Sequence, residues 1–208
     1  MRLKWTGVVA VVALAANLFA GDPLPPPERQ GGLPLMECLN LRKSSREFGS
    51  EALPPQVLSN LLWAASGVNR DDGRRTSPTA RNRQEVEIFV ATADGVFRYD
   101  AAAHALVKHA DGDSRDLTGT QDFVKDAAVN LVYVADWDKM GDAGEEDKLL
   151  YSGADVGCIV QNVYLYCASA GLATVVRGSV DREALAAHWK LPANQRVILA
   201  QTVGFPPQ

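Results

Sequence analysis

Three cations and two hydroxyls are crowded into one short segment of the sequence. Arg42, Lys43 and Arg46 fall within five residues, and Ser44 and Ser45 lie between them. Guanidinium, ammonium and hydroxyl donors at the end of a helix can surround a phosphate or the polar edge of a heterocycle. A charged run is more often only a solvated turn, so spacing alone leaves both interpretations open.

Apolar residues on both sides predict how this cationic segment is held. Leu35, Met36, Leu39 and Leu41 have helical spacing, so a helix should lead into the segment. Phe48 follows it as an apolar anchor. The donors are therefore expected at the end of a helix, where they can act together.

The cationic segment also resembles a family signature. Residues 42–48 (RKSSREF) are similar to the R-[RK]-S-x-R-x-F pattern that opens the flavin-binding domain of the nitroreductase family. In that family the two arginines and the serine contact FMN. The resemblance implies the first FMN contacts at Arg42, Lys43, Ser44 and Arg46.

A second part of this resemblance lies in the polar loop at 71–84. On composition the loop is merely exposed, but 78–84 (PTARNRQ) is similar to the family segment P-S-[AG]-x-N-x-Q. In the family this segment lines the flavin ring. The resemblance therefore implies cofactor contacts at four further residues, Pro78, Thr79, Asn82 and Gln84.

The C-terminal third of the chain supplies further matches. Family members place flavin contacts where a strand leaves the sheet, which implies contacts at Val176, Arg177 and Gly178. The terminal Gly204-Phe205-Pro206 resembles the family's G-[YF]-P. Many relatives continue further and supply a cation to the FMN phosphate. Here that contact is expected from Arg42, Arg46, Arg75 or a partner subunit.

One long helical pattern is expected to carry the dimer contact. Apolar residues recur at helical spacing through 148–171, with small residues in the first half. The run resembles the family's central helix, which is the dimer core there. Gln161 and Asn162 are polar residues in this apolar span, so each is expected to need a buried partner.

The remaining pattern predicts an α+β chain. Helices are expected at 54–65 and 181–188, and strands at 85–92, 96–100, 105–109, 128–135, 172–177 and 195–203. The resemblance implies a nitroreductase-like fold with a central, mostly antiparallel sheet flanked by helices, in an intertwined homodimer. The hairpin at 94–109 resembles the branch of thiazoline and oxazoline oxidases (SagB/ThcOx-type). Trp137 and Met140, in the loop at 136–147, are expected either to form a lid over the active site or simply to pack within the fold.

The N-terminus predicts export. A short basic start is followed by about 15 apolar residues and a small-residue exit, which is typical of a secretory signal peptide at 1–20. Residues 21–32, rich in proline and glycine, are expected to be an exposed linker, and 33–208 a single FMN-binding domain. The composition, 47% hydrophobic with a net charge of −4, suits a globular domain without general attraction to nucleic acid. The expected location is the periplasm.

The cysteines and histidines offer no metal spacing. Cys158 and Cys167 are nine residues apart in one expected helix, about 13 Å along its axis, which is too far for a disulfide. Either Cys38 pairs with one of them or all three are buried thiols. The three histidines are scattered, so no metal site is expected.

The resemblance implies an FMN-dependent oxidoreductase that exchanges hydride or electrons with a nitro, quinone or ring-dehydrogenation substrate. Its electron donor would be NAD(P)H or, after export, an extracytoplasmic redox partner. No general acid or base and no G-x-S-x-G or P-loop motif is found in the sequence. Two alternatives are an exported flavin- or small-molecule-binding dimer without turnover, and a structural dimer without a ligand.

Overall fold

A six-stranded sheet lies at the centre of the structure, a computed structural model that describes residues 23–207. The strand order is β3-β2-β1-β4-β6-β5, and each neighbouring pair is antiparallel. The strands are β1 (Val86–Thr92), β2 (Gly95–Asp100), β3 (Ala105–Asp111), β4 (Val129–Asp136), β5 (Ala173–Arg177) and β6 (Gln195–Gly204). All six predicted strands are present, and the sheet has the predicted antiparallel character.

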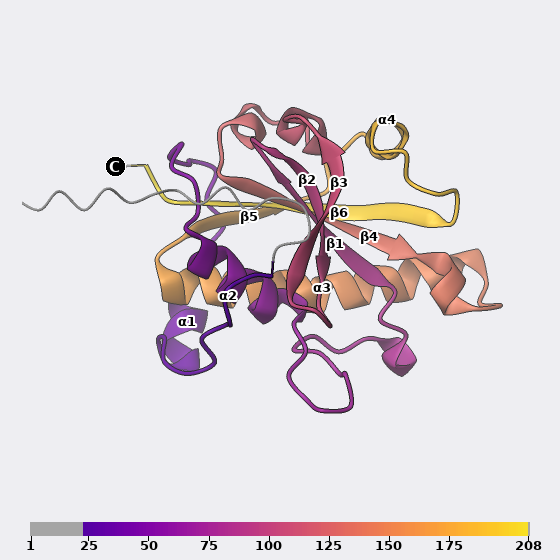
Figure 1. Cartoon of the computed structure of the whole chain (residues 1–208), viewed down its shortest axis with the longest axis horizontal. Helices are drawn as coiled ribbons and strands as arrows, with labels where there is room; N and C mark the ends of the chain where they lie inside the picture. The colour runs from indigo at the N-terminus through magenta and orange to yellow at the C-terminus, as the bar shows by residue number, and fades with distance from the viewer. Residues whose placement is uncertain (1–22, 208) are drawn as a thin grey trace, which may run out of the picture.

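Helices cover both faces of this sheet (Figure 1). On one face lie α1 (Leu35–Leu41), α2 (Pro55–Ser66) and the long α3 (Glu145–Ala170). The other face carries α4 (Arg182–His188) and two short 3-10 helices, η2 (Arg115–Thr118) and η3 (Asp122–Lys125). Two more 3-10 helices, η1 (Ala80–Asn82) and η4 (Trp137–Met140), lie in loops. Each face therefore has its own apolar core.

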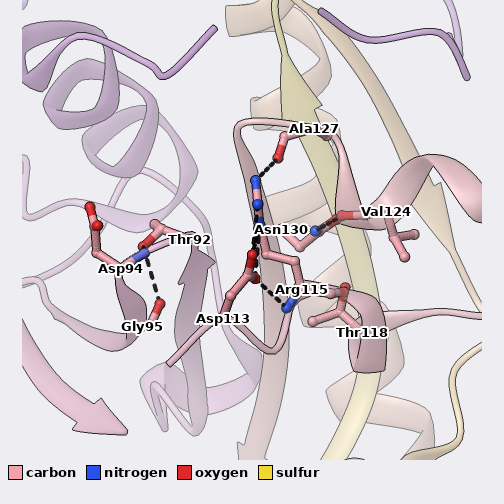
Figure 2. Close-up of polar contacts among 9 residues, drawn as sticks. All are labelled: Thr92, Asp94, Gly95, Asp113, Arg115, Thr118, Val124, Ala127 and Asn130. Atoms are coloured by element: carbon pink, nitrogen blue, oxygen red, sulfur yellow. Dashed lines mark hydrogen bonds and ion pairs between the residues drawn. The ribbon is translucent and has the colours of Figure 1, made fainter. Parts of the chain in front are cut away.

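The segment between β3 and β4 is held on this second face of the sheet through polar contacts. Arg115 is bonded to the Asp113 carboxylate and donates to the Ala127 carbonyl at 2.8 Å. Asn130, buried in β4, donates to the Val124 carbonyl at 2.6 Å. Figure 2 shows these contacts drawing the segment back onto β4. A polar stretch without much apolar surface is thus fixed by its own hydrogen bonds.

Helix α3 begins earlier than its apolar pattern predicts. It starts at Glu145 rather than Lys148, because three acidic residues in its first turn stabilise the positive N-terminal end of the helix. It ends at Gly171, whose φ of 70° is the left-handed conformation that commonly terminates helices.

The outer face of α3 is open to solvent. Gly157 and Gln161 are exposed, and Asn162 is half-buried. The expectation that Gln161 needs a buried partner is therefore wrong for the single chain. Small side chains on this face would allow another helix to approach closely.

The segment expected to be an exposed linker at 21–32 is hydrogen-bonded to the domain where the structure describes it, although most of its described residues are exposed. Leu24 is buried, and its amide donates to the His104 carbonyl at 3.0 Å. Ser59 of α2 donates to the Pro25 carbonyl, and its hydroxyl also lies 2.8 Å from His104 Nε2. A single apolar side chain and these hydrogen bonds hold a proline-rich segment that composition alone describes as free.

The predicted signal peptide, 1–20, lies outside the described residues. Among residues 23–207, no helix combines the length and the apolar character needed to cross a bilayer.

All three cysteines have free thiols. Cys158 and Cys167 do not pair, as their spacing predicts, and Cys38 is not bridged to either of them. Cys38 and Cys167 are buried, whereas Cys158 is half-buried because it lies near the outer face of α3. The expectation of three buried thiols is therefore wrong for Cys158.

The α2–α3 core predicts a large cost for truncating its central leucine. Leu61 is fully buried between these helices and the sheet. Leu61→Ala should lower the free energy of unfolding by about 2–5 kcal/mol, since it removes apolar contacts and leaves a cavity. Urea unfolding measures this change. The same substitution at the half-exposed Leu117 should change the free energy by under about 0.5 kcal/mol; equal losses at both positions would contradict this account of the core.

Candidate functional site

The cationic segment leaves α1 and runs beside the edge strand β5. The Arg42 amide donates to the Cys38 carbonyl as the helix ends, and the Ser45 amide donates to Thr174 O at 2.9 Å. These main-chain bonds fix the segment while its side chains remain accessible. Arg42, Lys43 and Arg46 form no ion pair with any acid in the described part of the chain. Three cations are thus available to an anion.

Tyr164 of α3 brings two predicted cofactor residues together. Its hydroxyl accepts the Val176 amide at 3.0 Å and shares a second hydrogen bond, of 2.8 Å, with Ser44. The Arg42 guanidinium lies 5.1 Å from the centre of the Tyr164 ring, within the range of a cation–π contact. The tyrosine therefore ties the cationic segment to the exit of β5.

A cavity of about 280 Å³ opens at this point. Its polar lining comes from Lys43, Ser45, Tyr164 and Thr174, and the C-terminal Pro206 closes one side. The remaining lining is apolar and comes from α1, α3 and the start of β5. Apolar walls with a few polar groups are typical of small-molecule sites. We call this the cationic cavity.

Arg177 points away from the cationic cavity. Its guanidinium donates to the Thr118 carbonyl at 2.6 Å, to Asn130 Oδ1 at 2.9 Å and to Thr202 Oγ1 at 2.9 Å. Consecutive residues of a strand face opposite sides of the sheet, so Val176 faces Tyr164 and Arg177 does not. Burial lowers the pKa of Arg177 to about 10. Only the main chain of Arg177 could therefore contact a cofactor in the cationic cavity. Gly178, the next residue, is exposed.

The predicted segment 78–84 forms a tight loop around η1. Arg81, Asn82 and Gln84 have φ values of 56°, 54° and 50°, the left-handed conformation that non-glycine residues rarely adopt. The Gln84 amide donates to Thr79 Oγ1, and the Gln84 side chain donates to Asn82 Oδ1. Pro78 and Asn82 are exposed. The loop holds a strained backbone, which such hydrogen bonds must support.

A second, larger cavity of about 640 Å³ lies beside this loop. Arg81 and Arg83 line one side, and Asp147 and Tyr151 from α3 line another. Met140 of η4 also lines it. We call this the loop cavity.

The two residues considered for a lid pack instead. Met140 is buried and its sulfur accepts a contact from the Ser152 hydroxyl at 3.4 Å. Trp137 packs against the core, and the Arg196 guanidinium lies 4.8 Å from its ring. Their apolar surfaces are already covered, which favours the packing alternative.

The two cavities lie at opposite parts of α3. The loop cavity touches Tyr151, whereas the cationic cavity touches Tyr164, 13 residues further along. This separation is roughly 20 Å along the helix axis. Figure 1 shows α1 at one end of α3 and the segment around residue 80 towards the other. A single chain therefore does not bring the two predicted segments into one cleft.

A sequence model of the nitroreductase family matches residues 39–205. The chain belongs to the nitroreductase family. A Methanocaldococcus jannaschii protein whose name assigns it to the nitroreductases is 32% identical over 155 residues, or 70% of this chain and 78% of that protein. A Ralstonia eutropha crystal structure, also assigned by name to the nitroreductases, is 43% identical with a TM-score of 0.87, and the match covers 91% of both chains. The predicted nitroreductase-like fold is confirmed.

A more distant structure shows the fold alone. The NADPH:FMN oxidoreductase of Vibrio harveyi, solved with NAD+, is 20% identical to this chain with a TM-score of 0.64. The match covers 84% of this chain and 69% of that one. This chain therefore shares its fold with an enzyme to which it has little sequence similarity.

Sequence reasoning missed the two α3 side chains that hold the predicted segments. Tyr164 stands among the apolar positions of the helical pattern at 148–171, although a buried tyrosine hydroxyl needs a partner. Asp155 lies in the stretch that resembles the family helix, and it accepts the Ala80 amide of the loop at 2.9 Å. A buried polar atom in an apolar helical run was the available signal for both.

The Tyr164 hydroxyl predicts a stability effect. Tyr164→Phe leaves the Val176 amide and the Ser44 hydroxyl without this partner, so the free energy of unfolding should fall by about 1–3 kcal/mol. Denaturant unfolding measures the change. The matched control is Tyr151→Phe, where the side chain is exposed and under about 0.5 kcal/mol is expected. A Tyr164→Phe variant as stable as this control would remove the assigned role.

Proposed function

We propose that the chain is an FMN-dependent oxidoreductase that exchanges hydride or electrons with a small organic substrate. The observation that carries the proposal is the segment of Arg42, Lys43 and Arg46, cations without an acidic partner in the described chain. Lys43 lines the cationic cavity, and Arg42 lies over the ring of Tyr164, which lines it as well. Family membership supports an oxidoreductase. The FMN dependence and the substrate type remain part of the proposal.

The donor set fits the chemistry of FMN. A phosphate monoester favours guanidinium and ammonium groups, and the segment that lines the cationic cavity through Lys43 also carries Arg42 and Arg46. The flavin ring needs apolar walls with a few polar groups, which the cationic cavity provides. Ser44 adds a hydroxyl for the sugar-alcohol chain or the ring edge.

A homodimer would bring the two predicted segments together. In a two-fold pairing of α3 helices that crosses near Cys158, Tyr151 of one copy lies opposite Leu165 of the other. The loop cavity of one subunit then faces the cationic cavity of its partner. The exposed, small-residue face of α3 supports such a pairing, because exposed Gly157 permits close approach. This arrangement also gives Gln161 a setting in which it can be buried.

In the proposed reaction, the residues of this chain would bind the cofactor, compensate its charge and exclude water. Bound FMN would supply the hydride- and electron-transferring ring. Arg42 and Arg46 would hold the phosphate or compensate negative charge on the ring. The strained loop around Asn82 would contact the ring from the partner subunit, and the paired α3 helices would exclude water.

The donor and the cellular location follow from residues 1–20 as part of the proposal. A signal peptide would place the mature protein in the periplasm, where NAD(P)H is scarce. The proposed donor there is a reduced quinone (a quinol) or a redox protein, and NAD(P)H would serve if the chain stays in the cytosol. In the SagB/ThcOx-type branch, supported by the β2–β3 hairpin, the substrate would be a ring that is dehydrogenated. The ring itself would then donate hydride to the flavin, and a quinone or an oxidised redox protein would accept the electrons.

Reconstitution distinguishes the proposed function from its alternatives. The protein purified with FMN should be yellow, should bleach with NADH or dithionite, and should regain its absorbance with a nitroaromatic or a quinone. Dithionite bleaching without reoxidation by any acceptor would favour the binding dimer without turnover. A colourless protein that binds no FMN would overturn the proposal.

The cationic trio predicts a selective loss of affinity. Arg46→Ala should weaken FMN binding by about 10–100-fold, because it removes a charge-assisted hydrogen bond. Quenching of FMN fluorescence measures the dissociation constant. Lys125→Ala removes an exposed cation from the opposite face of the sheet and should leave the constant within about twofold. Equal weakening in both variants would indicate only a general charge effect.

A further inference from the structure

A fully buried acid follows the strained loop directly. Glu85 has 0% of its surface exposed, and its main-chain carbonyl accepts the Asp136 amide at 2.9 Å. Neither carboxyl oxygen has a hydrogen-bond partner among residues 23–207. An ionised carboxylate at such a position is strongly unfavourable unless it is compensated. The Glu85 carboxyl must therefore either bind a proton or have its negative charge compensated.

A second buried acid lies beside it. Asp155 of α3 is 7% exposed, and its Oδ2 accepts the Ala80 amide. Burial, and in second place the neighbouring Asp155 carboxylate, raises the pKa of Glu85 to about 7. Two adjacent buried carboxyls do not both ionise readily, so one proton on the pair relieves the repulsion. Below pH 7, Glu85 is the member that carries it.

The loop depends on this pair for its link to the rest of the fold. Between Thr79 and Arg83, the other main-chain hydrogen bonds of the described structure stay inside the loop, from Asn82 to Thr79 and from Arg83 to Ala80. The bond from Ala80 to Asp155 connects the loop to α3. It anchors the residue immediately before the left-handed Arg81. Moving Asp155 would release the strained backbone.

We propose that Glu85 and Asp155 act as one carboxyl pair that holds a single proton, and that this pair positions residues 79–83 for the cofactor. The inference rests on the proposed function, because it gives the loop a cofactor to contact. Glu85 and Asp155 are positioning residues in this scheme: Asp155 holds the loop, and Glu85 keeps Asp155 in place. The proton stays on the pair, and no bond to the cofactor is formed.

The charged surroundings fix the sign of the pH dependence. From its own loop Arg83 acts on Glu85 and favours ionisation, and from α3 Asp155 opposes it. From β4 the facing group is the Asp136 amide, while the Asp136 carboxylate is bonded to Asn194 and the Asp138 amide. Removing the shared proton above pH 7 places two negative charges together. The loop should then loosen, and cofactor affinity should fall.

The experiment compares wild type with Glu85→Gln, which keeps the shape and a hydrogen-bond donor but cannot ionise. Hydrogen exchange of the amides at 79–84 is measured without cofactor at pH 6.0 and 8.5, after correction for intrinsic exchange. The FMN dissociation constant is measured at the same pH values. In wild type, the protection of these amides and the affinity for FMN should both fall about tenfold at the higher pH. A difference of one pKa unit between the anchored and the loosened loop corresponds to this factor. In Glu85→Gln the protection should stay constant, and the FMN affinity should change only as the titration of the FMN phosphate at about pH 6 requires.

The control is Glu146→Gln, an exposed carboxylate in the first turn of the same helix, which should behave as wild type. Identical pH profiles in Glu85→Gln and Glu146→Gln would overturn the inference. Should Glu85→Gln not fold, carbon-13 titration of glutamate carboxyls in wild type decides: a carboxyl titrating near pH 7 supports the pair, and its absence contradicts it. A protein that binds no FMN would overturn the proposed function, whereas the exchange profile would still test the pair.

Discussion

The arrangement depends on burial along one side of α3. Val156, Ile159, Val163 and Cys167 pack against the sheet, so the helix cannot rotate or slide without exposing apolar surface. Two polar side chains within this packed face, Asp155 and Tyr164, therefore have fixed positions. The first holds the loop that precedes β1, and the second holds the segment that follows α1. A single packed helix thus sets the position of both predicted cofactor segments.

The elements were predictable because their signals are local. Strand alternation and helical periodicity place every strand of the sheet and the helices α2, α3 and α4. The start of α3 was missed because three acidic residues continue the helix beyond its apolar pattern. The Arg177 side chain lies on the other face of the sheet by simple strand alternation, so this orientation was open to sequence reasoning.

Other features needed the folded chain. The contact of Tyr164 with Ser44 joins residues 120 positions apart, and no local pattern encodes that pairing. The same holds for the bond from Leu24 to His104, which ties a mostly exposed segment to the domain. The separation of the two cofactor segments along α3 also depends on tertiary geometry. The family motifs indicate what kind of group each segment could bind, but they do not give the distance between the two segments in one chain.

Arg177 and Glu85 offset the free-energy cost of burying an ionisable group in different ways. The Arg177 guanidinium is buried without an acid, but carbonyl, amide and hydroxyl oxygens accept its hydrogen bonds, so it can remain charged. Glu85 finds no donor among the described residues, so neutralisation by a proton is the less costly state. The arginine therefore keeps its charge over the physiological pH range, whereas the acid titrates within it. In the proposed scheme, sensitivity to pH therefore lies at the loop end of α3, where Glu85 and Asp155 are buried together.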